Sequence, residues 1–193
     1  MNDRLDRQLA FLVEADRLKR IERASWITGR IRRENSAEHS WHLALFALTL
    51  ADQAPDGVRI DRVIRMLILH DLVEIDAGDA PIHGTYDAEA LARQERAAAD
   101  RIFGLLPDDL AQGFRALWEE FEAAESPDAI FAKSLDRFQP PVLNLHSEGG
   151  SWPEYDVTED QIRSRVGHKI AKGAPGLWDW LSPKLTAWFS SHS

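Results

Sequence analysis

The sequence predicts an all-α protein, a single domain built as a bundle of about seven or eight helices. Apolar residues recur at helical spacing along most of the 193 residues, and strand-like alternation is scarce. The composition is 44% hydrophobic and 28% charged, as in globular chains with one core. The chain shows no repeat and no long Gly/Ser linker, so we expect one domain over residues 1–193.

In the first half of the chain, turn and capping residues separate three helical patterns. Leucines at helical spacing predict a first helix that ends near Ile21, and a loop follows it. Ser36 is the expected N-cap of a second helix that runs to about residue 53, where a Pro-Asp-Gly turn stops it. A third apolar stripe begins at Ile60 and predicts a helix that ends near Ile75.

In the second half, intrinsic helix propensity and capping residues predict the remaining helices. Ala-, Arg- and Glu-rich or apolar-striped segments favour three further helices, over about residues 87–103, 107–124 and 127–145. Pro140 and Pro141 are expected to bend or end the last of these. Thr158 and Gln161 have capping-box spacing, and they open the C-terminal helices, which span residues 158–190.

Composition and charge exclude several classes of protein. The chain has no cysteine, which rules out disulfides, thiolate metal sites and cysteine nucleophiles. Its N-terminus is polar, and no apolar run approaches the roughly 18 residues needed to cross a bilayer. We therefore expect a cytoplasmic protein with no membrane partner. The formal net charge of −9 argues against binding a nucleic-acid polymer.

One basic segment departs from this acidic average. Residues 17–33 carry seven Lys or Arg side chains and one Glu, which gives the segment a local charge of 7 − 1 = +6. A patch of this kind can attract a small anion without attracting DNA. A solvated helix face has the same sequence pattern, so the charge alone leaves both readings open.

Titratable residues extend the apolar stripes of the second and third helices. Four residues before Leu43 in the second stripe stands His39, and the third stripe continues into His70 and Asp71. Burying such groups without partners is costly, and a shared metal ion would supply one. Imidazole and carboxylate donors suit manganese, cobalt, zinc, iron or nickel better than magnesium, and they disfavour calcium. Hydrogen-bonded core histidines are the alternative reading.

Three motifs together resemble the HD-domain superfamily and, within it, the 5′-deoxynucleotidase-like branch. They are Glu38-His39-Ser40, then His70-Asp71-Leu72-Val73-Glu74, then Gly78-Asp79. The resemblance covers about residues 18–145 and implies an HD-type helical bundle. It also implies one divalent metal ion, with the ligands His39, His70, Asp71 and Asp136.

Asp136 is the predicted distal ligand because it shares an inward-facing line with Ala132 and Leu143. Asp128 falls in the first turn of the same helix, where an Asp usually serves the helix terminus. A surface ion pair between Asp136 and Lys133 is the alternative reading.

The resemblance implies that Glu74 and Asp79 are catalytic residues that act beside the metal on water and substrate. A phosphate dianion at such a site needs local positive charge, and the basic segment is the densest supply. The candidate phosphate-binding residues are Arg23, Arg32 and Lys133. The expected function is a metal-dependent phosphohydrolase that releases phosphate from (deoxy)nucleoside monophosphates with a metal-activated water.

Two other functions remain open on the sequence alone. The same four ligands serve HD hydrolases of nucleoside triphosphates, alarmones or cyclic nucleotides, and a non-catalytic helical protein could use the metal as a staple. The family's Arg-Trp pair, which helps to select deoxyribose, is replaced here by Arg23-Ala24-Ser25-Trp26, so the sugar preference is open. A homodimer is expected by analogy alone.

Overall fold

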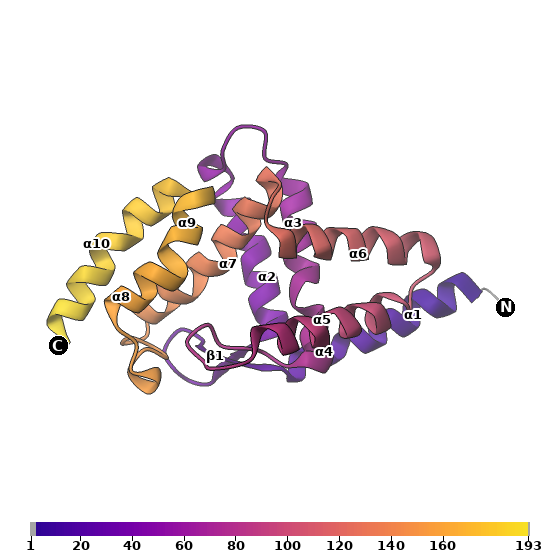
Figure 1. Cartoon of the computed structure of the whole chain (residues 1–193), viewed down its shortest axis with the longest axis horizontal. Coiled ribbons are helices and arrows are strands. Elements are labelled where there is room, and N and C mark those ends of the chain that lie inside the picture. The colour runs from indigo at the N-terminus through magenta and orange to yellow at the C-terminus, as the bar shows by residue number, and fades with distance from the viewer. Residues whose placement is uncertain (1–2, 193) are drawn as a thin grey trace.

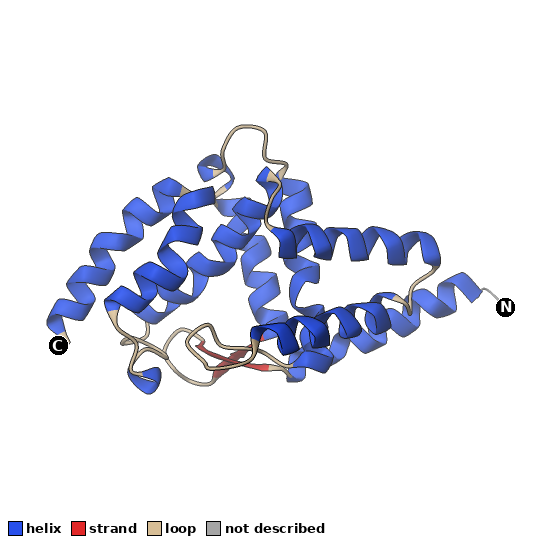
Figure 2. Cartoon of the chain, viewed as in Figure 1, coloured by secondary structure: helices blue, strands red, loops and turns tan. Residues whose placement is uncertain are grey.

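The computed structural model describes residues 3–192 and is predominantly helical, which confirms the predicted fold class. Figure 1 shows the helices in chain order: α1 (Asp3–Ala15), α2 (Ser36–Thr49), α3 (Ile60–Leu69), α4 (Glu74–Ala77), α5 (Ala88–Phe103), α6 (Asp108–Ala123), α7 (Pro127–Leu145), α8 (Glu159–Ile162), α9 (His168–Gly173) and α10 (Pro175–Ser191). Strands β1 (Glu22–Trp26) and β2 (Arg33–Asn35) pair as a small antiparallel sheet (Figure 2). Within residues 3–192, no helix is both long and apolar enough to span a membrane.

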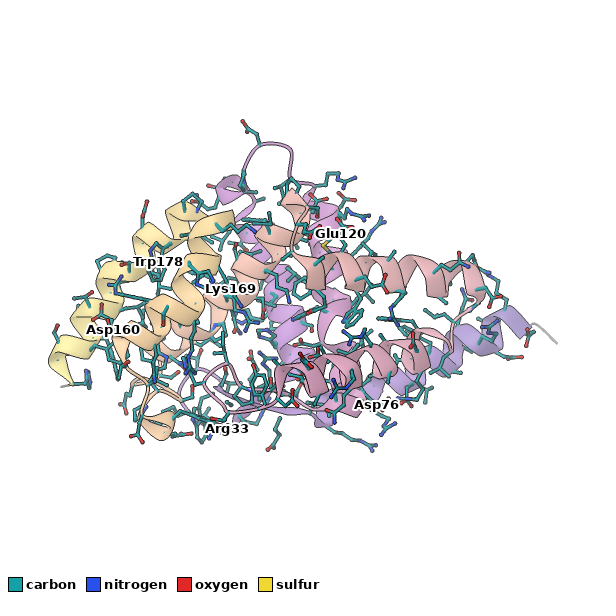
Figure 3. All side chains as sticks on the ribbon, in the orientation of Figure 1. Arg33, Asp76, Glu120, Asp160, Lys169 and Trp178 are labelled. Atoms are coloured by element: carbon teal, nitrogen blue, oxygen red, sulfur yellow. The ribbon has the colours of Figure 1, made fainter. Side chains whose placement is uncertain are left out.

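Helix α7 lies at the centre of the fold and contacts α2, α3, α6, α9 and α10. The helices α8 to α10 lie at one end of the molecule, and α1, α5 and α6 extend toward the other (Figure 1). Side chains fill the spaces between these ribbons (Figure 3). The buried apolar residues form one cluster, to which α7 contributes Phe131, Ala132 and Leu135 among others. Because α7 is packed on several sides, its polar residues face the interior as well.

The segment before α2 differs from the predicted loop. Residues 22–35 form a β-hairpin in which Glu22 pairs with Asn35 and Trp26 with Arg33. The sequence predicted Ser36 as the N-cap of α2, and this was wrong, because the N-cap is Asn35. The Asn35 side chain accepts a hydrogen bond from the backbone of Glu38, whose carboxylate accepts one from Asn35 in return. This capping box leaves the Ser36 hydroxyl free to bind elsewhere.

Three other expected helices have different ends in the structure. The first α-helix ends at Ala15 and continues as a 3₁₀ turn to Arg20. The third narrows at His70 into a 3₁₀ turn before α4 begins. Helix α7 continues past Pro140 and Pro141 to its end at Leu145, although a proline inside a helix costs about 3 kcal/mol. The buried contacts of α7 on several sides offset that cost.

Two helical glycines offer a test of the packing around α7. A Cβ on Gly173 of α9 would lie 2.7 Å from the backbone oxygen of Ile130 in α7, whereas a Cβ on Gly113 of α6 would meet nothing within 4 Å. We expect Gly173→Ala to lower the free energy of unfolding by about 1–3 kcal/mol through overpacking. Gly113→Ala should raise it by about 0.5–1 kcal/mol, since Ala favours the helix. Urea unfolding of both variants measures the two signs.

Candidate metal centre

Three buried side chains from separate parts of the chain meet at one point. His39 comes from the first turns of α2, His70 from the 3₁₀ turn after α3, and Asp136 from the middle of α7. Each offers one ligand atom, and these atoms all lie within 4.8 Å of one another. The group could therefore hold one metal ion.

The local structure around His70 orients its ring. Its Nδ1 lies 2.9 Å from the backbone oxygen of Leu67, and because a carbonyl only accepts, Nδ1 carries the proton. Nε2 then presents its lone pair to the cluster. This atom is buried, it has no hydrogen-bond partner among residues 3–192, and it lies 3.0 Å from Asp71 Oδ1 and 3.9 Å from Asp136 Oδ1. An imidazole nitrogen that faces carboxylates without a hydrogen-bond partner fits a metal ligand.

His39 is held in a comparable way from the other side of the cluster. Its Nε2 lies 3.1 Å from Asp136 Oδ1, and its Nδ1 faces the buried carboxylate of Glu34 at 3.4 Å. Burial and the charge of Arg23 act to lower the pKa of His39, but the carboxylates of Asp136 and Glu34 outweigh them and raise it. A cation among the three ligand atoms would take the place of the proton that a raised pKa favours on His39.

Asp71 lies between this cluster and Arg23 of β1. Its Oδ1 is close to His70, and its Oδ2 accepts a hydrogen bond from Arg23 Nη1 at 2.9 Å. Burial would raise the pKa of Asp71, but the neighbouring His70 and Arg23 hold it well below its ordinary value. Asp71 is outside the three-residue group defined by ligand-atom distances. One of its oxygens nevertheless faces the same point.

Arg23 is surrounded by carboxylates, and its side chain is 12% exposed. Besides Asp71, three others lie within 3.5–3.8 Å of its guanidinium nitrogens: Glu34, Glu74 and Asp79. Burial, together with the charge of Asp71, raises the pKa of Glu74 well above its ordinary value, and the pKa of Asp79 is raised for the same reasons. The site thus holds more acidic groups than its arginines neutralise.

A charge count shows what the site lacks. Glu74 is counted as protonated because its pKa is raised, so Asp136 and the other three carboxylates around Arg23 carry four negative charges when ionised. Arg23 and Arg137 supply two positive charges, so 4 − 2 leaves two negative charges. Such an excess in a buried place is costly without further compensation. A divalent cation would offset it. Donor chemistry, the free Nε2 of His70 and this charge balance therefore all fit a metal ion.

The predicted catalytic residues lie beside this cluster. Glu74 is the first residue of α4, and its Oε2 accepts a hydrogen bond from the Ser36 hydroxyl at 2.5 Å. Asp76 on the same helix, labelled in Figure 3, accepts a hydrogen bond from Arg101 of α5, which ties α4 to the neighbouring helix. Both Glu74 and Asp79 line a cavity that also contains His70 and Asp71, which we call the cluster cavity.

The predicted phosphate-binding residues do not all reach this cavity. Arg23 and Lys133 line it, and Lys133 also pairs with Glu122 at 2.9 Å. Arg32 instead makes two hydrogen bonds to Glu38 and lines a separate pocket. Four other members of the basic segment pair with Glu14, Asp16 or Glu154, namely Arg17, Lys19, Arg30 and Arg33. The basic segment therefore contributes Arg23 to the cluster cavity, while Arg32 and these four residues pair with carboxylates elsewhere.

Sequence reasoning missed two residues that the structure places in the site. Glu34 accepts a hydrogen bond from Gln139 of α7 at 2.8 Å while facing His39, and Arg137 lies 3.5 Å from Asp136 Oδ2. Glu34 stands in a three-residue strand, too short for its burial to show in the pattern. Arg137 is adjacent to Asp136 but carries no signal of its own.

Comparison with known proteins adds a family to this geometry. The family model described as "HD domain" matches residues 15–178. The 5′-deoxynucleotidase HDDC2 of Homo sapiens is 34% identical over 130 residues, which span 67% of this chain and 62% of the human protein. The HDDC2 of Danio rerio is 34% identical over 144 residues, or 74% of this chain and 70% of that protein.

Solved structures match over nearly the whole chain. A predicted metal-dependent phosphohydrolase from Magnetospirillum magnetotacticum superposes with a TM-score of 0.93 at 43% identity, covering 99% of this chain and 98% of the other. An HD-domain phosphohydrolase from Listeria innocua superposes with a TM-score of 0.60 at 15% identity, covering 96% and 99%. The second match supports the fold alone.

Proposed function

The chain belongs to the HD-domain family, as the match over residues 15–178 shows, and we propose that it is a metal-dependent phosphohydrolase that releases phosphate from nucleoside 5′-monophosphates. The family resemblance predicted from the motifs is thereby confirmed. The observation that carries the proposed activity is the meeting of His39, His70 and Asp136 beside a buried arginine. The 5′-deoxynucleotidase names of the relatives support the substrate class.

In this proposal the metal ligands are His39, His70, Asp71 and Asp136. Two imidazole nitrogens with carboxylate oxygens favour manganese, cobalt, zinc, iron or nickel over magnesium, and disfavour calcium. When bound, such an ion supplies Lewis-acid chemistry, since it lowers the pKa of a coordinated water and polarises a phosphoryl oxygen.

The remaining residues bind the phosphate and handle protons. Arg23 turns from its carboxylate partners to the phosphate, and Lys133, which also lines the cluster cavity, is the second phosphate-binding residue. Asp79 orients the attacking water. Glu74, whose pKa burial raises, holds a proton for the leaving O5′ atom. Water attacks phosphorus, the P–O5′ bond breaks, and the products are inorganic phosphate and a nucleoside, without a protein nucleophile.

A phosphate-release screen tests this function directly. It uses deoxy- and ribonucleoside monophosphates with manganese, cobalt, zinc and magnesium, and includes nucleoside triphosphates and cyclic nucleotides. The screen includes both sugars because the structure gives Trp26 no position from which to select deoxyribose. Its indole donates a hydrogen bond to Glu154 and does not line the cluster cavity. We expect phosphate from monophosphates. Turnover of triphosphates or cyclic nucleotides alone would assign another HD hydrolase, and a metal-dependent rise in melting temperature without turnover would indicate a structural metal.

Glu34 is expected to support metal binding through His39. Replacing a carboxylate that faces a ligating histidine typically costs about 10–100-fold in metal affinity. We therefore expect Glu34→Gln, which keeps the shape of the side chain, to weaken the binding of Mn²⁺ by that factor in a calorimetric titration. Glu22→Gln, in the exposed first residue of β1, is the matched control and should leave the affinity unchanged. Equal affinities in the two variants would contradict this role.

A further inference from the structure

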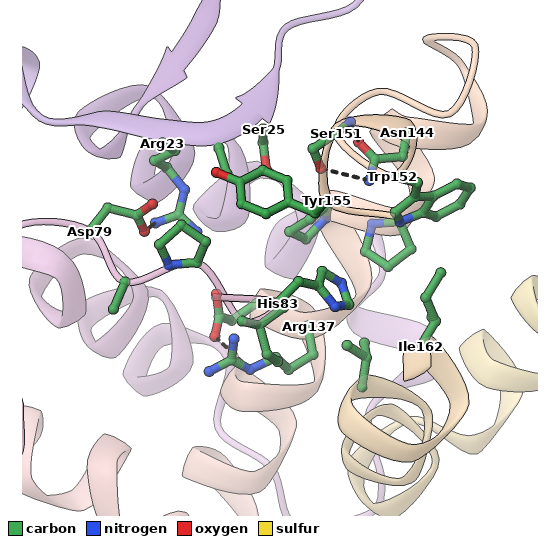
Figure 4. Close-up of a pocket in the computed structure, with 18 residues that line it drawn as sticks. Arg23, Ser25, Asp79, His83, Arg137, Asn144, Ser151, Trp152, Tyr155 and Ile162 are labelled. Carbon is green, nitrogen blue, oxygen red and sulfur yellow. Dashed lines mark hydrogen bonds and ion pairs between the residues drawn. The ribbon is translucent and has the colours of Figure 1, made fainter. Parts of the chain in front are cut away.

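A second cavity adjoins the cluster cavity on the side of the C-terminal part of the chain. The two share the residues Arg23, Asp79, Ala80, Asp136 and Arg137. From this junction the second cavity, which we call the side cavity, runs to residues of the loop after α7 and to Ile162 and Val166 (Figure 4). A molecule whose phosphate lay at Arg23 could place its other end in either of these two cavities.

The walls of the two cavities differ in chemistry. The cluster cavity is lined by carboxylates such as Glu74 and Glu95. Apart from the residues shared with the cluster cavity, no carboxylate lines the side cavity among residues 3–192, and six of its residues carry rings: Pro81, His83, Pro140, Pro141, Trp152 and Tyr155. A flat heterocycle gains contact area against such rings and stacking on the aromatic ones.

The aromatic residues of the side cavity are placed to receive a planar group. Trp152 is 2% exposed, and its ring centroid lies 5.0 Å from that of Trp188 and 5.2 Å from that of Phe189. This packing holds the Trp152 ring in place at one end of the side cavity. Figure 4 shows Tyr155 and His83 between this end and the Arg23–Asp79 pair. Tyr155 is 41% exposed, and the Nδ1 of His83 is buried without a hydrogen-bond partner among residues 3–192. A base could pack against the ring faces of both residues.

The turn that carries Tyr155 is held by the β-hairpin. Glu154 accepts a hydrogen bond from Trp26 Nε1 at 2.8 Å and also pairs with Arg30 and Arg33. Arg33 stacks over the Trp26 ring at 4.1 Å. These contacts tie the hairpin to residues 153–155 and fix the position of Tyr155. Part of the basic segment thus shapes the side cavity.

We infer that the side cavity is the subsite for the nucleobase of the substrate, with Tyr155 and His83 as its contacts. This inference rests on the proposed function, because it takes the phosphate to lie at Arg23. It predicts that the chain recognises the base as well as the phosphate, so that an ester with the same sugar and no base binds more weakly.

Equilibrium binding tests the subsite without depending on turnover. The full chain with Mn²⁺ is titrated calorimetrically with the phosphonate analogue of deoxyadenosine monophosphate, whose P–C bond resists hydrolysis. The second ligand is the corresponding phosphonate of 2-deoxyribose. We expect the base-bearing ligand to bind about 5- to 100-fold more tightly, the range found for base–aromatic stacking. Tyr155→Ala and His83→Ala should each bring the two dissociation constants closer together by at least about threefold.

Tyr86→Ala is the matched control, because Tyr86 is the chain's other tyrosine and lines the cluster cavity. Equal affinities of the wild-type chain for the two phosphonates would overturn the inference, and so would a loss of discrimination in Tyr86→Ala instead of Tyr155→Ala. An unchanged melting temperature shows that Tyr155→Ala folds. The proposed function fails separately, if no monophosphate releases phosphate in the screen.

Discussion

The variant Asp136→Ala is expected to lose bound metal and phosphate-releasing activity together. Asp136 Oδ1 is the atom that joins the two histidines, at 3.1 Å from His39 Nε2 and 3.9 Å from His70 Nε2. Replacing a residue that supports a ligand costs about 10–100-fold in metal affinity, so we expect the loss of a direct ligand to cost more than about 100-fold. Calorimetry with Mn²⁺ and a phosphate-release assay measure the two effects.

A thermal assay separates loss of the ion from loss of the fold. A metal ion that binds the folded chain but not the unfolded chain stabilises the fold by about 2.7 kcal/mol when its free concentration is a hundred times the dissociation constant. Mn²⁺ should therefore raise the melting temperature of the wild-type chain but not of Asp136→Ala. Asp179→Ala, in an exposed position of α10, is the control and should respond as the wild type does. A metal-dependent rise in the melting temperature of Asp136→Ala would contradict its role as a ligand.

The helices could be predicted because their signal is local. Asp87 caps α5, Ser126 caps α7 and Thr158 forms the expected capping box, each within a few residues of the helix that it starts. The β-hairpin could not be predicted, because its strands have five and three residues and show no alternation. The run of α7 through Pro140 and Pro141 depends on packing from other helices, which no local pattern reports.

The residues of the candidate site also divide into those that a local sequence pattern predicts and those that depend on the fold. His39 and His70 could be identified because they are polar residues that extend apolar stripes. A buried titratable side chain needs a partner, so this local pattern indicates a site. The partners of the basic segment were not identifiable. Arg33 pairs with Glu154, a residue 121 positions away, and Arg32 with Glu38 across the start of α2. Ion pairing at a surface depends on which carboxylate the fold brings near. The single domain, homodimer and cytoplasmic location stay predictions.

The variant Glu74→Gln is expected to keep its metal and lose turnover. Glutamine has the size of glutamate and can still accept the hydrogen bond from Ser36, but it cannot hold a transferable proton. General acid catalysis contributes about 100- to 10,000-fold, so kcat for a nucleoside monophosphate should fall by that factor. Calorimetric affinity for Mn²⁺ should stay within about threefold of the wild type, since Glu74 is not among the proposed ligands. Asp76→Asn, two residues along α4 and paired with Arg101, is the control and should keep its kcat.

The choice of leaving group then tests where the proton of Glu74 goes. Nitrophenolate leaves phosphorus without a proton, whereas the O5′ atom of a nucleoside needs one. Glu74→Gln should therefore be impaired far less on p-nitrophenyl phosphate than on a nucleoside monophosphate, because the missing proton matters in one reaction alone. Equal impairment on both esters would move Glu74 to the activation of water and leave Asp79 as the acid. If kcat on the nucleotide fell by less than about tenfold, Glu74 would be neither the general acid nor the general base.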